Sequence, residues 1–365
     1  MPSKNSFDKI LFGLTLALLV FGLIMLWSAS TTEGVQNFGS SSYFVVQQLT
    51  RGVLGGLIAM YALTKLDYHK LKSLAFPLIG LSVLLLVLVK LPGIGFTANG
   101  ATRWLDLGVF LFQPSEVVKL FFIIYLAAWG ANKINPKEPS QSIAAPILIL
   151  GLITSLILFQ PDLGTALSII LTAGIMLFIN GTNVKFLAIL TGIGSAALGI
   201  LIWFEPYRLS RITAFLNPDF DPLGIGYQIN QAMIAIGSGG LFGYGYGLSR
   251  QKHFYLPETL NDSIFAVVAE ELGFVRVLAL LAIFIYLIVR SAQVSSKAPD
   301  QFGRMLGLGI TALFGVNVII NVGAMLSLLP LTGIPLPFFS YGSSAMIVNL
   351  AAIGILLNIS KQAKR

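Results

Sequence analysis

About ten apolar runs, each close to 20 residues long, account for most of this chain. A helix needs about 20 apolar residues to cross the hydrocarbon core of a bilayer. The composition agrees, because 56% of the residues are hydrophobic and only 10% are charged, against roughly 25% charged in an ordinary soluble domain. The sequence therefore predicts an all-α polytopic membrane protein, and it excludes a cytosolic enzyme, a disordered chain and a secreted disulfide scaffold. The predicted spans lie near residues 10–29, 44–64, 73–91, 114–132, 144–160, 163–180, 186–204, 263–289, 303–325 and 341–360.

The positions of lysine and arginine set the predicted orientation. Fourteen of the 23 basic residues fall in segments on the same side as the N-terminus, and segments rich in such residues face the cytoplasm. Both termini are thus predicted to be cytoplasmic, and residues 1–365 to form one integral-membrane domain. The longest connection, about 205–262 between the seventh and eighth spans, is then extracellular. Its many tyrosines, phenylalanines and glycines do not indicate disorder, and ordered loops of this length are usually functional.

The chain offers little for metal or redox chemistry. It has no cysteine and two histidines, which excludes a cysteine-based redox or zinc site and leaves few imidazoles for other metals. The net charge of +8 is expected of cytoplasmic loops and does not indicate a nucleic-acid partner.

Charged residues in or beside the spans are the candidate functional groups, because charge is costly there. Glu116 and Lys119 lie three residues apart at the start of the fourth span, so they share a helix face and can pair. The pair either fixes helix packing or lines a polar cavity, and the two roles are compatible.

Two arginines map to the same outer side as Lys119. Arg51 lies in the outer part of the second span, where it could extend to the headgroups. Arg103 precedes the fourth span, where a lone arginine is ordinarily solvated. Together these cations suit a lipid phosphate or pyrophosphate, because arginine binds phosphate bidentately and lysine acts as a point charge.

Carboxylates occur at the starts of the sixth and eighth spans. Asp162 needs no role beyond capping the sixth helix. Asp262 ends the long outer loop, and it either caps the eighth helix or presents a carboxylate where a substrate headgroup would lie. Glu270 and Glu271 follow about two turns further in, so at least one of them should be paired or line the cavity. Arg276 is a possible partner on the same helix.

Residues 328–344, the proline segment, connect the ninth and tenth spans. Three prolines within eight residues cannot form a regular helix. Irregular backbone at membrane depth is tolerated where protein or a polar cavity satisfies it. The proline segment is therefore predicted to be a re-entrant or packed loop.

Seven short motifs, in order along nearly the whole chain, resemble the SEDS family of bacterial integral-membrane proteins (shape, elongation, division and sporulation). The motifs are residues 27–30 (WSAS), 99–104 (NGATRW), 113–119 (QPSEVVK), 160–165 (QPDLGT), 221–228 (DPLGIGYQ), 262–273 (DSIFAVVAEELG) and 335–342 (PLPFFSYG). Residues 249–258 (SRQKHFYLPE) resemble the division branch of the family, whereas residues 234–240 (IAIGSGG) also occur in its elongation branch. We favour the division branch.

The resemblance implies a peptidoglycan glycosyltransferase that polymerises lipid II at the outer face of the bacterial cytoplasmic membrane, at the division septum. It implies a class B penicillin-binding protein transpeptidase and other divisome proteins as partners, besides membrane lipid. The family's essential carboxylate falls on Asp262. Its cavity positions fall on Arg51, Arg103, Glu116, Lys119 and Asp162. The chain departs from many relatives at Leu260-Asn261, where they have His-Thr, and at Arg276, where they have Gly.

Glycosyl transfer to a sugar hydroxyl needs a base for the proton of the attacking oxygen and positive charge for the leaving pyrophosphate. We assign Asp262 as the general base for the acceptor lipid II. Arg51, Arg103 and Lys119 would hold the pyrophosphate, with Arg208, Arg211 or a divalent cation (Mg²⁺ or Mn²⁺) as further candidates. Glu116 would orient Lys119. Since only one carboxylate is clearly placed, we expect inversion at the anomeric carbon.

Other functions also fit ten spans with intramembrane charges. A lipid II flippase is the first, although the charges cluster toward the outer side and no paired inverted repeat of interrupted helices is evident. A scaffold that only docks and activates the penicillin-binding protein is the second, and it predicts that charge changes in the cavity are silent. Within the family, an elongation-type polymerase is the alternative.

Overall fold

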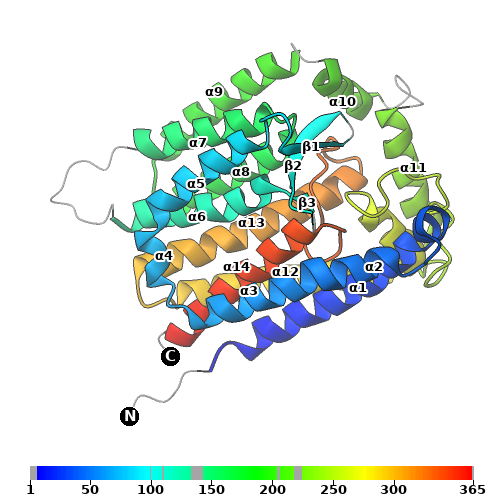
Figure 1. The fold of residues 1–365 in the computed structure, drawn as a ribbon, viewed down its shortest axis with the longest axis horizontal. Helices are drawn as coiled ribbons and strands as arrows, with labels where there is room; N and C mark the ends of the chain where they lie inside the picture. Colours follow the sequence, from blue (N-terminus) through cyan, green and yellow to red (C-terminus); the bar gives the residue numbers. More distant parts are fainter. Residues whose placement is uncertain are drawn as a thin grey trace.

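A helix lies at every predicted apolar run. The computed structural model describes residues 6–98, 100–108, 111–132, 143–203, 206–217 and 224–363 (Figure 1). The first four runs correspond to α1 (Lys9–Phe38), to the consecutive helices α2 (Tyr43–Gln47), η1 (Gln48–Val53, a π-helix) and α3 (Leu54–Lys65), to α5 (Ala75–Leu88) and to α6 (Pro114–Asn132). The other six correspond to α7 (Ala144–Leu158), α8 (Leu163–Ile179), α9 (Val184–Trp203), α12 (Ile264–Ser296), α13 (Gln301–Met325) and α14 (Ser343–Gln362).

Length and composition make these helices membrane segments. Within the described residues, α1, α6, α12, α13 and α14 are each long and apolar enough to cross a bilayer, and α5, α7, α8 and α9 contain shorter apolar stretches. The prediction of a mainly helical, polytopic membrane protein is therefore confirmed.

The expectation of an all-α fold is wrong in one respect. Strands β1 (Gly95–Ala98), β2 (Ala101–Asp106) and β3 (Leu111–Phe112) form a small antiparallel sheet in the order β1-β2-β3. The sheet lies in the polar connection between the third and fourth runs, where a search for apolar runs finds no signal. Short helices also occur outside the runs, namely α4 (His69–Ser73), α10 (Pro206–Leu216) and α11 (Ile225–Ser238). The last two lie in the connection that was expected to be a loop.

The helices form a bundle with two distinct ends. Figure 1 shows that α1 begins and α14 ends at one end, next to α4, whereas the sheet, α10 and α11 lie toward the other end. The described residues that directly precede α12 also lie toward the end with α10 and α11 (Figure 1).

The centre of the bundle is formed by α13 and α14. Helix α13 packs against α6, α8 and α12, while α14 packs against α3, α6, α12 and α13. Small residues permit the close approaches, as is common between helices in membranes. A Cβ atom added at Gly354 on α14, for example, would lie 2.6 Å from the carbonyl oxygen of Met60 on α3.

Helix α12 is interrupted at Gly273, where φ is 74° and ψ is 174°. This conformation is essentially restricted to glycine. The groups that the interruption leaves without helical partners bond to residues 240–245 instead. The amides of Phe274 and Val275 donate to Gly240 and Leu241, and the carbonyls of Glu270 and Glu271 accept from residues 244 and 245, all at 2.9–3.1 Å. Residues 240–245 thus complete the backbone hydrogen bonding of a broken helix.

Replacing Gly273 by alanine should destabilise the protein by about 1–3 kcal/mol or more, because the backbone is strained for an L-residue and the space is filled. A Cβ atom there would lie 2.1 Å from the amide nitrogen of Gly243. The thermal unfolding midpoint in detergent measures the effect. Gly192→Ala in α9 is the control, since its Cβ would meet nothing within 4 Å. An equal midpoint for the two variants would contradict this account.

Candidate active site

Asp262 lies in the turn that leads into α12 and is buried, with 9% of its surface exposed. Its main-chain carbonyl accepts a hydrogen bond from Nδ2 of Asn321 on α13, and the same nitrogen donates to the carbonyl of Ile334, both at 2.9 Å. The carboxylate faces the proline segment, because a Cβ atom added at Gly333 would lie 4.0 Å from Oδ2. Helix α12 has Ser263 as its N-cap and no side-chain cap. The capping alternative for Asp262 is therefore wrong.

The surroundings of Asp262 favour its protonated form. Burial, together with the negative charge of Glu258, raises the pKa of Asp262 to about 6, while the positive charge of Arg211 opposes this shift. A carboxyl group with such a pKa is well suited to accept a proton near neutral pH.

Arg211 reaches this region from α10. Its Nη1 donates to the carbonyl of Leu331 at 2.9 Å, so it holds the proline segment as well as acting on Asp262. The side chain of Arg208, one turn earlier, lies outside the described residues.

The proline segment is packed, as predicted, and it links Asp262 to the other candidate residues. Leu336, Phe338 and Phe339 are buried. The Ser340 hydroxyl donates to the carbonyl of Asn261 at 2.6 Å, and the Tyr341 amide donates to that of Leu260 at 2.8 Å. These bonds hold the turn before α12 at two further carbonyls, next to the one bound by Asn321.

The same segment contacts the second run through Gln48. This buried side chain of η1 donates to the carbonyl of Ser340 at 3.4 Å and accepts from the amide of Gly342 at 3.1 Å. Arg51, one helical turn later on η1, is half-buried and interacts electrostatically with the hydroxyl of Tyr341.

Arg103 is not a solvated loop residue. It lies on β2, where Nε donates to the carbonyl of Gln160 at 3.2 Å and Nη2 donates to that of Pro161. Its guanidinium group thereby binds carbonyls of the turn between α7 and α8. Arg103 is held by the backbone that leads directly into Asp162.

Asp162 caps α8, as its capping alternative predicted. Its Oδ1 accepts from the amide of Thr165 at 3.1 Å, and Oδ2 lies 3.5 Å from the side chains of Gln113 and Ser115 at the start of α6. The amide of Gln113 in turn donates to Ser344 at 2.9 Å. Hydrogen bonds thus connect the ends of α6, α8 and α14.

Glu116 and Lys119 form the predicted ion pair. Lys119 Nζ lies 2.8 Å from Glu116 Oε1, and both residues are 3% exposed. An isolated charge at this depth would be very unfavourable, so each of the two residues can be buried only because the other is paired with it. Whether the pair also contacts a substrate stays a prediction.

A second buried ion pair escaped the sequence analysis. Lys252 Nζ lies 3.0 Å from Glu271 Oε1 and also donates to Ser28 on α1 at 3.0 Å. Glu270 accepts the amide of Arg250 at 2.9 Å. Both glutamates therefore anchor residues 249–252. Arg276, the partner considered on the same helix, instead donates to the carbonyl of Phe242. In the sequence, two adjacent glutamates within an apolar run, followed by Gly273, are the feature that indicates this site.

No metal centre is evident in the described residues. They contain no group of three or more histidines, aspartates and glutamates arranged to hold an ion. A divalent cation stays a prediction of the sequence, and no step below depends on it.

Comparison with known proteins identifies relatives of nearly full length. Residues 8–365 match the family described as "Cell cycle protein" (FtsW/RodA/SpoVE). The chain is 40% identical over 366 residues to the probable peptidoglycan glycosyltransferase FtsW of Trichlorobacter lovleyi, covering 98% of this chain and 94% of that protein. It is 40% identical over 364 residues to stage V sporulation protein E of Bacillus subtilis, covering 99% of both.

Solved structures share the fold. A chain from a structure of a peptidoglycan synthase complex that coordinates polymerisation and crosslinking superposes with a TM-score of 0.78 at 30% identity, covering 97% of both chains. The rod shape determining protein RodA of Thermus thermophilus superposes with a TM-score of 0.73 at 29% identity, covering all of both chains.

Separating Glu116 from Lys119 should show that they act as a unit. Lys119→Met leaves a buried carboxylate without its cation and should cost about 3–5 kcal/mol, whereas the double variant Glu116→Gln/Lys119→Met should recover much of that loss. Thermal or denaturant unfolding of the purified protein measures both. A double variant less stable than the single one would contradict the pairing argument.

Proposed function

The chain belongs to the FtsW/RodA/SpoVE family of cell cycle proteins, and on that premise we propose that it is a peptidoglycan glycosyltransferase that polymerises lipid II during cell division. The observation that carries the chemistry is Asp262, a buried carboxyl group with its pKa raised to about 6. It lies where α10, the proline segment and the start of α12 meet.

Asp262 acts as the general base in the proposed reaction. Its carboxylate takes the proton of the acceptor sugar hydroxyl while that oxygen bonds to the anomeric carbon of the donor strand. The bond from that carbon to the pyrophosphate of the lipid carrier breaks, and its electron pair leaves with the pyrophosphate. One base and one displacement give inversion at the anomeric carbon.

Positive charge stabilises the departing pyrophosphate. Arg51 and Arg211 are the best placed, since one lies beside Tyr341 and the other beside Asp262. Arg208 belongs to the same helix as Arg211. Arg103, bonded to the turn after α7, and Lys119, paired with Glu116, add positive electrostatic potential and position the substrate in the proposed reaction. Asp162 orders the start of α8 beside them.

The proposed topology has ten spans, with both termini in the cytoplasm and the connection 205–262 outside, which brings Asp262 to the outer face of the cytoplasmic membrane. Support comes from the distribution of lysine and arginine and from the common end of the bundle at which α1 begins and α14 ends (Figure 1). The septum is the proposed location.

The proposed partner is a class B penicillin-binding protein, which crosslinks the strands that this chain makes, within a larger set of division proteins. The structural similarity to a chain of a peptidoglycan synthase complex supports it. Polymerisation of labelled lipid II by the purified protein, with and without that partner, tests the proposal. No strands in either sample, together with transfer of lipid II across vesicle membranes, would establish the flippase alternative instead.

Asp262→Asn should reduce the polymerisation rate by about 100-fold or more, because a general base contributes about 10²–10⁴. The variant should unfold at the same temperature or higher, since it removes a buried charge. Asp106→Asn, an exposed residue of β2, is the matched control and should stay active. A folded Asp262→Asn protein with full activity would remove Asp262 from the mechanism.

The polymerisation rate should fall about tenfold per pH unit below pH 6, because the base must be ionised and the pKa of Asp262 is raised to about 6. Removing the charge of the exposed Glu258 lowers that pKa toward its ordinary value. Glu258→Gln should therefore move the acidic limb of the rate profile to lower pH, whereas Asp106→Asn should leave it in place. A profile flat to pH 5 would exclude Asp262 as the titrating base.

A further inference from the structure

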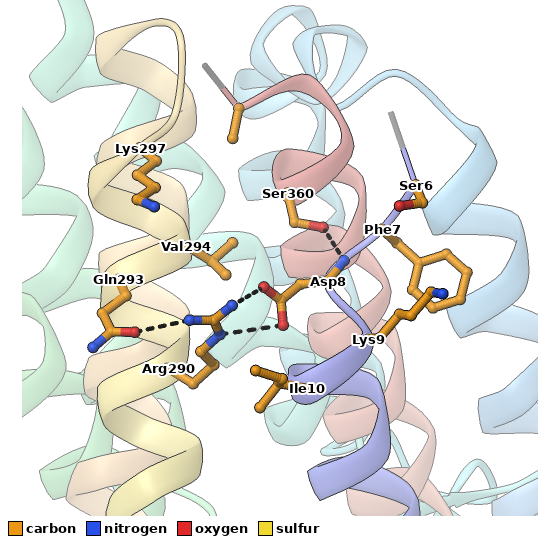
Figure 2. A pocket seen from close by; sticks show the side chains of 11 residues that line it. Ser6, Phe7, Asp8, Lys9, Ile10, Arg290, Gln293, Val294, Lys297 and Ser360 are labelled. Carbon is orange, nitrogen blue, oxygen red and sulfur yellow. Dashed lines mark hydrogen bonds and ion pairs between the residues drawn. The ribbon is translucent and has the colours of Figure 1, made fainter. Parts of the chain in front are cut away.

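A cavity of about 460 Å³ lies at the end of the bundle opposite Asp262. It is formed where α1 begins and where α12 and α14 end (Figure 2). Its lining comprises Ser6, Phe7, Asp8, Lys9, Ile10, Arg290, Gln293, Val294, Lys297, Ser360 and Ala363. None of these residues takes part in the proposed glycosyl transfer, so the cavity needs an explanation of its own.

The lining is basic. It contains three cations, Lys9, Arg290 and Lys297, and one carboxylate, Asp8. Asp8 is already bound, because its oxygens lie 2.6 Å from Nη2 and 3.2 Å from Nε of Arg290, and Oδ1 also caps α1. Figure 2 shows Arg290 reaching across the cavity from α12 to Asp8, with Lys297 further along the same helix. The Asp8–Arg290 pair joins the start of α1 to α12, which form two walls of the cavity. Lys9 and Lys297 are exposed.

Residues around the cavity add a further positive charge and exposed apolar side chains. Lys361 lies 5.9 Å from the centre of the Phe7 ring, which places a fourth cation at the rim. Ile10 is 44% exposed at the start of α1, and Val289 is 44% exposed on the last part of α12. Cationic groups above exposed apolar side chains match the boundary between phosphate headgroups and acyl chains.

We propose that this cavity binds the phosphate headgroup of an anionic phospholipid, with its acyl chains along the exposed apolar faces of α1 and α12. Basic pockets between the ends of membrane helices on the cytoplasmic side bind such headgroups. Figure 2 shows Lys297 on the α12 side of the Asp8–Arg290 pair and Lys9 on the Phe7 side. In the proposed site the two lysines attract the phosphate from opposite walls, and the Asp8–Arg290 pair holds those walls together. In the proposed topology this is the inner leaflet, so the site is separate from the chemistry at the outer face.

Thermal unfolding of the full-length protein in detergent tests the site. Mixed micelles containing phosphatidylglycerol should raise the midpoint by about 3–6 °C over micelles containing phosphatidylcholine, because a ligand of the native state stabilises it. Lys9→Gln/Lys297→Gln should lower the apparent affinity for phosphatidylglycerol about tenfold. Arg290 is left intact, since its loss would leave Asp8 unpaired.

The control removes two charges elsewhere at the same end of the bundle. Lys70→Gln/Lys72→Gln changes two exposed lysines of α4 that do not line the cavity, and it should keep the wild-type response. An equal loss in the control, or an equal stabilisation by phosphatidylcholine, would overturn the proposal. A shift of the same size with inorganic phosphate alone would also overturn it, because the ligand would then be a soluble anion. Each of these results is independent of polymerisation activity.

Discussion

The side-chain amide of Asn321 donates to the carbonyls of Asp262 and Ile334 at 2.9 Å each. Both carbonyls belong to irregular backbone, which must find partners when it is buried. One nitrogen on the rigid helix α13 thus holds together the turn that carries the acidic group and the proline segment. Ser340, Tyr341 and Gln48 add the bonds that extend this arrangement to η1. The position of the turn that carries the carboxylate therefore depends on side chains and backbone from α13 and the proline segment.

The buried carboxylates of this protein differ in what compensates them. Glu116 and Glu271 each have a lysine ammonium group within 2.8–3.0 Å, and these two ion pairs serve packing. At Asp262 the compensating charge is that of Arg211, and burial still raises the pKa. The protein thus uses the same chemical group in two ways. The carboxylates of Glu116 and Glu271 fix helices and loops through their lysine partners, whereas Asp262, with its raised pKa, is suited to exchange a proton.

The sequence predicted those features that depend on neighbours along the chain. Apolar runs located the helices, the spacing of three residues gave the Glu116–Lys119 pair, and the residue before α8 gave the Asp162 cap. It failed where partners come from distant segments. Lys252, which precedes α12, bonds to Glu271 on that helix and to Ser28 on α1. Arg103 on β2 bonds to a carbonyl of the turn between α7 and α8. Arg276 is the neighbour expected for Glu270 or Glu271 along an unbroken helix, but the helix is broken at Gly273 between them. The strands escaped because short polar segments carry no strong periodicity.

The interruption of α12 separates the part of the helix that crosses the membrane from the part that packs against the protein near Asp262. The part from Phe274 to Ser296, about 34 Å long at 1.5 Å per residue, is sufficient to span the hydrocarbon core. The part from Ile264 to Leu272 is buried against the protein and anchored through Glu270 and Glu271. The hydrogen bonds from both sides of Gly273 to residues 240–245 hold the two parts at a fixed angle. The part that leads from Asp262 thus keeps its place in the protein core without having to follow the axis of the part that crosses the bilayer.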